Sequence, residues 1–269
     1  MGDDVLRVGV IGAAGRMGRE VCRTVDAAPD MEFAFAVDRR EAGTPVSDLI
    51  GAQAPDINVT ERLEEALSRE PRTRAAVDFT HPSAAAANGI VCLRHGVTPI
   101  IGTSGLTPQD LDGLRAEAET QGVPAFYIPN FALGAVLMMK FAKEAAQYMP
   151  ECEIIELHHD RKADAPSGTA MRTAELIAEG RRRPPKVPKT EVVKLQGARG
   201  GTLGETPIHS VRLPGLLAHQ QVIFGGPGEV LTVRHDSLSR ESFMSGVLLA
   251  LRNFQGHKGL VVGLENLLG

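Results

Sequence analysis

Short apolar runs alternate regularly with helix-like stretches over the first 130 residues, and this alternation constrains the fold most. The apolar runs cover residues 6–12, 32–38, 75–82, 98–105 and 124–131. A helix is expected over residues 16–28, and the later stretches between the runs also have helical character. Strands that alternate with helices at this spacing predict a parallel, doubly wound sheet.

The pattern changes after residue 130. A long helix is expected over 133–149, a strand over 152–159 and a helix over 169–179. Strand-like runs with little helix between them then follow, before a final helix over 240–255; these runs are 190–196, 207–215, 218–226 and 229–237. Such spacing is typical of an open, mainly antiparallel or mixed sheet.

The sequence therefore predicts an α/β protein with two domains. Residues 1–130 would form a Rossmann-like, doubly wound dinucleotide-binding domain, onto which residues 241–269 pack back. Residues 131–240 would form a smaller α+β domain with an open mixed sheet, used for substrate binding and oligomerisation.

Composition excludes several classes of function. Among 269 residues, 43% are hydrophobic, 23% are charged and the net charge is −4, as in an ordinary globular protein without a basic surface for nucleic acid. Three scattered cysteines favour a reducing compartment over disulfides or a zinc site. The first apolar run is too short for a membrane span, so we expect a cytoplasmic protein.

The stretch GVIGAAGRMGR places Gly12, Gly15 and Gly18 between the first strand and a helix. Glycines let the backbone approach a pyrophosphate, whose charge then meets the helix N-terminus. The spacing G-x-x-G-x-x-G is one residue wider in its first gap than the usual G-x-G-x-x-G. The alternative to a dinucleotide site is a tight strand-to-helix turn that binds no ligand.

Asp38 ends the second apolar run, 20 residues after Gly18, where a dinucleotide site places a carboxylate against the ribose hydroxyls. Arg39 and Arg40 follow at once and suit a 2′-phosphate, so tolerance of both NADH and NADPH is expected, although a solvated turn explains Arg40 equally well. Gly102, Thr103 and Ser104 end another run and offer groups for a nicotinamide amide.

The stretch HHDRKADAPSGTA, residues 158–170, admits three interpretations: chemistry, a metal site or a polar loop. His158 and His159 would point to opposite faces of a continuing strand, and no H-E-x-x-H spacing occurs, which argues against a metal. A histidine and Lys162 suit proton transfer. Ser167 would cap a helix whose first amides, at Gly168 and Thr169, suit an anion, and together these groups predict a small acidic substrate.

The pairing of VGVIGAAGRMGR with ELHHDRKADAPSGTA resembles the 4-hydroxy-tetrahydrodipicolinate reductase (dihydrodipicolinate reductase) family of the diaminopimelate and lysine pathway. The resemblance covers the whole chain and includes DFTHP, GTSG, PNFALG, HSVRLPG and RESFMSGVLLA. It implies a two-domain reductase that uses NADH or NADPH on a small dicarboxylate. It also implies a homotetramer with the second-domain sheets at its centre.

The resemblance also implies roles for individual residues. His158 would be the proton donor and acceptor and Lys162 the proton donor, while His159 would bind substrate. Two further residues would hold a substrate carboxylate, Gly168 and Thr169. Positions that match the family's cofactor site are Gly12, Ala13, Ala14, Gly15, Arg16, Met17, Asp38, Arg39, Gly102, Thr103, Ser104, Pro129, Asn130 and Phe131. Ser104 replaces a common threonine, and Asp38 replaces a glutamate of some relatives.

Two other classes remain open at this point. A regulator that senses NAD(P) without catalysis would keep the first 130 residues but would not need His158 and Lys162 together. Another small-acid reductase of the same architecture is the second; a phosphorylating semialdehyde dehydrogenase would need a nucleophilic cysteine, and neither Cys92 nor Cys152 is well placed.

Overall fold

The computed structural model describes residues 5–51, 56–186 and 192–268. By their internal contacts, the residues divide into two compact units. The first unit comprises residues 1–131 together with 243–269, and the second comprises residues 132–242.

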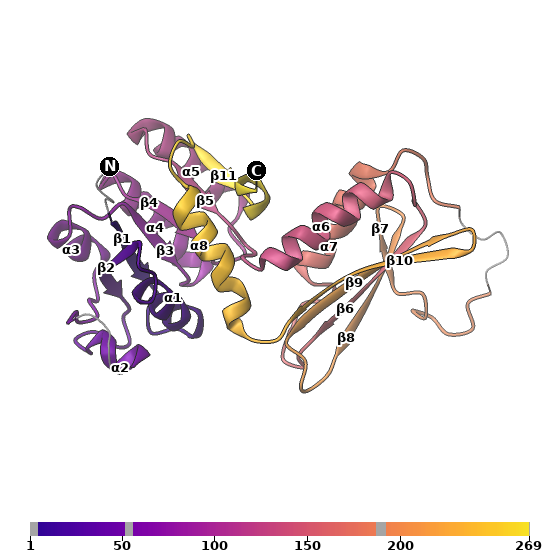
Figure 1. The fold of residues 1–269 in the computed structure, drawn as a ribbon, viewed down its shortest axis with the longest axis horizontal. Helices are drawn as coiled ribbons and strands as arrows, with labels where there is room; N and C mark the ends of the chain where they lie inside the picture. Colours follow the sequence, from indigo (N-terminus) through magenta and orange to yellow (C-terminus); the bar gives the residue numbers. More distant parts are fainter. Residues whose placement is uncertain (1–4, 52–55, 187–191, 269) are drawn as a thin grey trace. The chain divides into compact units, whose positions relative to one another are not determined.

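The first unit is built on a six-stranded sheet in the order β11-β5-β4-β3-β1-β2, and every neighbouring pair is parallel (Figure 1). Its strands are β1 (Leu6–Ile11), β2 (Met31–Val37), β3 (Ala75–Asp78), β4 (Thr98–Ile101), β5 (Ala125–Tyr127) and β11 (Leu260–Val262). The central strands are almost wholly buried, which is why they read as continuous apolar runs.

Helices cover this sheet. Two apolar clusters join it to α3, α4 and α5, while α1 and α8 pack on each other. Thr107 and Asp110 form a reciprocal capping box at the start of α5, as the sequence Thr-Pro-x-Asp indicates. The helices are α1 (Arg16–Asp26), α2 (Val46–Ile50), α3 (Leu63–Arg69), α4 (Pro82–Arg94), α5 (Pro108–Gln121), α8 (Met244–Asn253) and the 3₁₀ turn η2 (Leu264–Leu267).

The second unit has a five-stranded sheet in the order β10-β9-β6-β8-β7, and it is mixed because β6 and β8 are parallel while the other pairs are antiparallel. Helices α6 and α7 pack on it through an apolar cluster (Figure 1). The elements are α6 (Leu133–Ala146), β6 (Cys152–His158), α7 (Gly168–Gly180), β7 (Gly201–Leu203), β8 (Thr206–Arg212), β9 (Ala218–Gly226), β10 (Glu229–Ser237) and the turn η1 (Arg240–Phe243).

The predicted fold class is confirmed: a Rossmann-like parallel sheet with helices, plus an open mixed sheet. One predicted strand is wrong. Residues 190 and 191 lie outside the described part, and residues 192–196 form no strand, since Val192 and Val193 are exposed and pair with no neighbour. Within the described ranges, no helix is both long and apolar enough to cross a membrane.

Candidate active site

The glycine loop between β1 and α1 is packed so closely that side chains have no room. A Cβ on Gly18 would lie 2.0 Å from the carbonyl oxygen of Gly12, and Gly12 itself has a φ of +80°. Helix α1 begins after Gly15, which has no side chain to cap the first amides. The loop therefore offers the bare backbone and helix start that a pyrophosphate requires.

Asp38 follows β2 and is bonded to this loop. Its carboxylate accepts a hydrogen bond from the Ala14 amide at 3.1 Å and another from the Arg40 amide at 2.9 Å. A cavity of about 680 Å³ opens here, and Gly12, Gly15, Asp38 and both following arginines line it. The carboxylate is thus held at the wall of a cavity that begins at the glycine loop.

The loops after β3, β4 and β5 meet beside the glycine loop. Phe79 is the link, because its backbone lies 3.0 Å from the Cβ position of Gly12 and its ring faces both Gly102 and Phe131. A Cβ on Gly102 would clash with that ring at 2.3 Å, so the glycine is needed for the packing. Parallel strands end at one edge of a sheet, which explains this convergence.

The remaining predicted cofactor residues differ in exposure. Ala13 and Thr103 are buried, and the Thr103 side chain interacts with the carboxylate of Asp78. Arg16, Arg39, Ser104 and Pro129 are exposed, whereas Ala14, Met17 and Asn130 are half-buried. All of the predicted cofactor positions lie in the first unit, and the glycine cradle, the carboxylate and the cavity fit a dinucleotide.

The second group of predicted residues lies in the second unit, at the end of β6. Along β6, Cys152 and Ile154 face the apolar core under α6 and α7, and Glu156 and His158 continue on the same face because side chains alternate along a strand. Glu156 is completely buried. A carboxylate therefore stands where the alternating pattern would place an apolar side chain.

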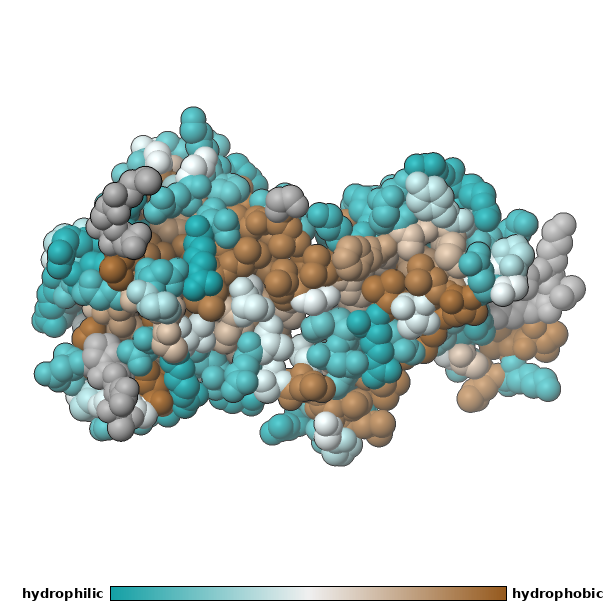
Figure 2. Space-filling model, viewed as in Figure 1, coloured by the Kyte–Doolittle hydropathy of each residue, from teal (hydrophilic) through white to brown (hydrophobic). Residues whose placement is uncertain are grey.

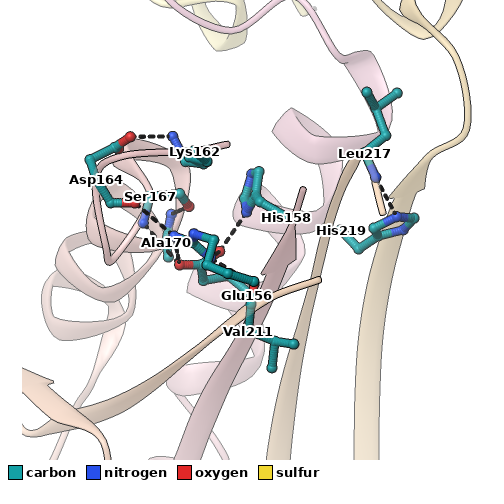
Figure 3. A network of polar contacts seen from close by, with 10 residues as sticks. Glu156, His158, Lys162, Asp164, Ser167, Ala170, Val211, Leu217 and His219 are labelled. Atoms are coloured by element: carbon teal, nitrogen blue, oxygen red, sulfur yellow. Dashed lines mark hydrogen bonds and ion pairs between the residues drawn. The ribbon is translucent and has the colours of Figure 1, made fainter. Parts of the chain in front are cut away.

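Glu156 is surrounded by donors (Figure 3). Its Oε2 accepts from His158 Nδ1 at 2.5 Å and from Arg212 at 2.9 Å. Its Oε1 accepts from Arg212 at 2.8 Å and from the Ser167 amide at 3.2 Å. Burial disfavours the ionised form, but the bonds from His158, Arg212 and Ser210 outweigh burial and lower the pKa of Glu156 from 4.5 to about 2.

Arg212 comes from β8, where it is the register partner of His158. It binds both oxygens of Glu156 and also donates to the backbone oxygen of Asp164 at 2.7 Å. Through these bonds the guanidinium ties the loop after β6 to the sheet.

Lys162 lies on that loop and pairs with Asp164 at 2.7 Å (Figure 3). The hydrogen bond from Lys162 lowers the pKa of Asp164. The Lys162 side chain is 21% exposed and that of Asp164 is 61% exposed, so the pair faces solvent. An incoming anion can therefore replace Asp164 as the partner of the Lys162 ammonium group.

Helix α7 begins at the end of the same loop. Ser167 caps it by accepting from the Ala170 amide at 3.2 Å, while a Cβ on Gly168 would meet no atom within 4 Å. Space therefore remains open at the helix start, where Thr169 follows. The ring nitrogen Nδ1 of His159 is buried and has no hydrogen-bond partner within the described residues. An unpaired buried nitrogen indicates a position for a polar ligand atom or water.

Two alternative chemistries find no support here. The described residues contain no group of three His, Cys, Asp or Glu side chains able to hold a metal ion. All three cysteines are free and buried, and burial raises the pKa of each thiol, that of Cys22 to about 12. Because the thiolate is the nucleophile, none of them is activated for an acyl-enzyme.

A parallel sheet with a glycine cradle, joined in one chain to a unit that gathers histidine, lysine and a helix start, defines an NAD(P)-dependent oxidoreductase. Comparisons with known proteins narrow this class. Two family models match nearly the whole chain: Dihydrodipicolinate reductase, N-terminus over residues 6–131 and Dihydrodipicolinate reductase, C-terminus over residues 134–268. The chain belongs to the dihydrodipicolinate reductase family.

Relatives at full length agree. The 4-hydroxy-tetrahydrodipicolinate reductase of Desulfitobacterium hafniense (strain DSM 10664 / DCB-2) is 48% identical over 263 residues, covering 98% of each chain. That of Moorella thermoacetica is 49% identical, again covering 98% of both. The solved dipicolinate-bound dihydrodipicolinate reductase of Paenisporosarcina sp. TG-14 is 43% identical with a TM-score of 0.86, over 98% of this chain and 100% of that one.

The sequence had not singled out Glu156 for a function. The available signal was a glutamate two residues before His158 in a strand whose inward positions, Cys152 and Ile154, are apolar. Arg212 completes the group, and its part depends on parallel pairing with a strand 56 residues away, which the local pattern does not contain.

Proposed function

We propose that this chain catalyses the NAD(P)H-dependent reduction of 4-hydroxy-tetrahydrodipicolinate to tetrahydrodipicolinate, with loss of water, in diaminopimelate and lysine biosynthesis. The observation that carries the proposal is the group around His158, Lys162 and the start of α7, in a chain of this family. A protein that only senses NAD(P) has no use for that group. In the net reaction, one hydride and one proton are added and one water leaves.

Proton transfer is assigned to the charged loop of the second unit. When bound, the nicotinamide supplies the hydride. Lys162 donates the proton and stabilises negative charge on the ring during reduction, effects typically worth about 10²–10⁴-fold in rate. His158, with Nδ1 bonded to Glu156, takes up and returns a proton through its other ring nitrogen.

Recognition of the two substrate carboxylates is assigned to His159 and to the start of α7 at Gly168 and Thr169. The open space at Gly168 and the unpaired Nδ1 of His159 support this assignment. Helix N-termini favour anions through the orientation of their first amides and the helix dipole. The Paenisporosarcina relative was solved with dipicolinate, itself a ring dicarboxylate.

The cofactor is assigned to the first unit, with the pyrophosphate on the loop Gly12–Met17 and the ribose hydroxyls on Asp38. Arg39 is exposed at the cavity wall, where it suits a 2′-phosphate. The nicotinamide amide is assigned to Gly102, Thr103 and Ser104 and to the segment 129–131. Thr103 is buried just after β4, at the edge of the sheet where the strands end, which supports this placement.

We further assign the second unit to assembly as a homotetramer in the cytoplasm. Its mixed sheet carries exposed apolar side chains on β10, Val230 and Leu231, and Leu213 and Leu238 are also exposed. Figure 2 shows hydrophobic patches, in brown, at the surface of this unit. Exposed apolar groups of this kind favour contact with another protein surface.

The decisive experiment supplies the substrate in situ. Pyruvate and aspartate semialdehyde are mixed with a condensing synthase, and the absorbance of NADH or NADPH is followed with and without this protein. We expect an enzyme-dependent loss of absorbance and one water released per cofactor oxidised. Binding of NADPH without its oxidation would overturn the proposal in favour of a sensor.

A further inference from the structure

Glu156 is a buried carboxylate that the proposed reaction does not use directly. Its two oxygens accept hydrogen bonds from His158, twice from Arg212, and from the Ser167 amide, and the Ser210 side chain contributes as well. We propose that Glu156 is a positioning residue for the reaction proposed above: it fixes His158 in one tautomer and holds it against the loop and helix that carry the other reacting groups.

The tautomer follows from hydrogen-bond chemistry. An ionised carboxylate only accepts hydrogen bonds, so the Nδ1 atom that contacts it must carry the hydrogen. The Nε2 atom of neutral His158 then keeps its lone pair. No partner of Nε2 exists among the described residues, so this atom is available to exchange a proton with a bound substrate.

Ionisation of Glu156 is secured by Arg212. The guanidinium reaches both carboxylate oxygens, and such bidentate pairs have fixed geometry and strong charge-assisted bonds. The pKa of Glu156 is lowered despite burial, so the carboxylate stays an acceptor at neutral pH. His158 can therefore gain and lose a proton at Nε2 while its Nδ1 hydrogen remains in place.

The same carboxylate links three elements. His158 ends β6, Arg212 ends β8 and also binds the Asp164 backbone, and Ser167 precedes α7. Lys162 lies on the loop between them. Glu156 thereby sets the distance from His158 to the loop of Lys162 and to the helix start at Gly168.

Glu156→Gln tests the tautomer most directly. The amide oxygen of glutamine will turn to Arg212, since the cation needs an acceptor, and the NH₂ group will then face His158. His158 must accept at Nδ1 and carry its hydrogen on Nε2, which is the wrong form for taking a proton. We expect kcat to fall about 10²–10⁴-fold, as for loss of a general acid–base group, with a much smaller change in KM.

Arg212→Gln is the matched control. It removes the other partner of the same carboxylate and the bond to the Asp164 backbone, but leaves the bond between Glu156 and His158. A purely structural role for Glu156 would make the two variants lose stability and activity alike. Because Arg212 also favours the ionised form of Glu156, our proposal expects Arg212→Gln to recover kcat as the pH rises and Glu156 ionises again, whereas Glu156→Gln stays impaired at every pH. Glu156→Asp keeps an acceptor for His158, so it should recover part of the rate.

Nitrogen NMR of histidine-labelled protein gives a readout that does not depend on activity. Long-range ¹H–¹⁵N spectra distinguish the two tautomers, and the His158→Gln variant assigns the resonances. At a pH where imidazoles are neutral, His158 should be Nδ1–H in the wild type and Nε2–H in Glu156→Gln. A wild-type His158 in the Nε2–H form overturns the proposal even if the variant fails to fold.

Failure of this inference is distinct from failure of the proposed function. If the wild type does not oxidise NAD(P)H with the generated substrate, the proposed function fails whatever the tautomer. If the wild type is active but Glu156→Gln keeps kcat within about twofold with an unchanged tautomer, the function stands and the positioning role is wrong.

Discussion

Two buried carboxylates, one in each unit, meet opposite surroundings. Asp78 ends β3 in the first unit and is 1% exposed. Its donors are neutral: the amide and hydroxyl of Thr80 at 2.7 and 2.6 Å, the side-chain amide of Asn88 at 2.8 Å, and the side chain of Thr103. Glu156 in the second unit is equally buried, but two of its partners are His158 and Arg212.

These surroundings shift the pKa values of Asp78 and Glu156 in opposite directions. Burial raises the pKa of Asp78, because neutral donors offset only part of the lost hydration. At Glu156 the bonds from His158 and Arg212 exceed the effect of burial and lower the pKa to about 2. The pKa of a buried carboxyl group is thus raised where its neighbours are neutral and lowered where they are basic.

This difference separates the tasks of the two units. Asp78 fixes Thr80 and Asn88, which line the cavity beside the glycine loop in the first unit. The second unit gathers charged side chains around His158 and Lys162, the two residues to which we assign proton transfer. Changes in the second unit should therefore affect chemistry, and changes in the first should affect cofactor binding.

The largest effect that this comparison predicts is for Lys162→Ala. Removing the ammonium group should reduce kcat about 10²–10⁴-fold, because both the proton and the stabilising charge are lost. The Kd of NADPH, measured by fluorescence titration, should stay nearly unchanged. Asp164→Asn is the control, since it removes the partner of Lys162 but keeps the lysine. Near-normal turnover of Lys162→Ala would take the lysine out of the chemistry.

A second prediction uses acid to separate the two carboxylates. Glu156 has a folded pKa below its unfolded value, so it stabilises the fold above pH 4.5, and this contribution of about 3 kcal/mol is lost as the pH falls toward 2. Asp78 has a raised folded pKa, so its burial costs stability as the pH rises and this cost disappears in acid. Acid should therefore weaken the second unit selectively.

Hydrogen exchange followed by mass spectrometry reports each unit through its own peptides, β3 for the first and β6 for the second. Corrected for intrinsic rates, protection of β6 should fall between pH 4.5 and 3 while that of β3 is kept. In Glu156→Gln, β6 should be less protected at pH 7 and lose little more in acid. Equal acid loss at β3 and β6 would contradict the opposite tuning of the two carboxylates.

The parts of this picture that sequence could supply are those encoded locally. Continuous apolar runs predict the buried parallel strands, and Thr107 with Asp110 predicts the start of α5. β11 escapes prediction because three residues, Leu260–Val262, show no periodicity, and it forms only by pairing with β5. The expected strand over 190–196 fails for the converse reason: Val192 and Val193 have apolar β-branched side chains but no strand beside them.

The candidate site divides in the same way. His158, Lys162 and Ser167 lie within ten positions, so their proximity is visible in the sequence. The partners that determine the protonation of these groups are not visible in the sequence, because Arg212 reaches Glu156 only through the pairing of β6 with β8. A carboxylate's ionisation depends on such distant neighbours, so the opposite tuning of Asp78 and Glu156 requires the fold.

The smallest predicted effect lies in the first unit, at Asp38. Asp38→Ala should raise the Kd of NADH about tenfold, which is the size expected when the ribose hydroxyls lose a charged hydrogen-bond acceptor. The affinity for NADPH should fall less, because the substitution also removes a negative charge from the place where the 2′-phosphate would meet Arg39. Asp38 also holds the amides of Ala14 and Arg40, so part of the loss will be common to both cofactors.

Asp38→Asn, which keeps an acceptor oxygen without the charge, separates these contributions. Isothermal titration of both cofactors measures the outcome, and equal losses in Asp38→Ala would mean that Asp38 acts only on the loop.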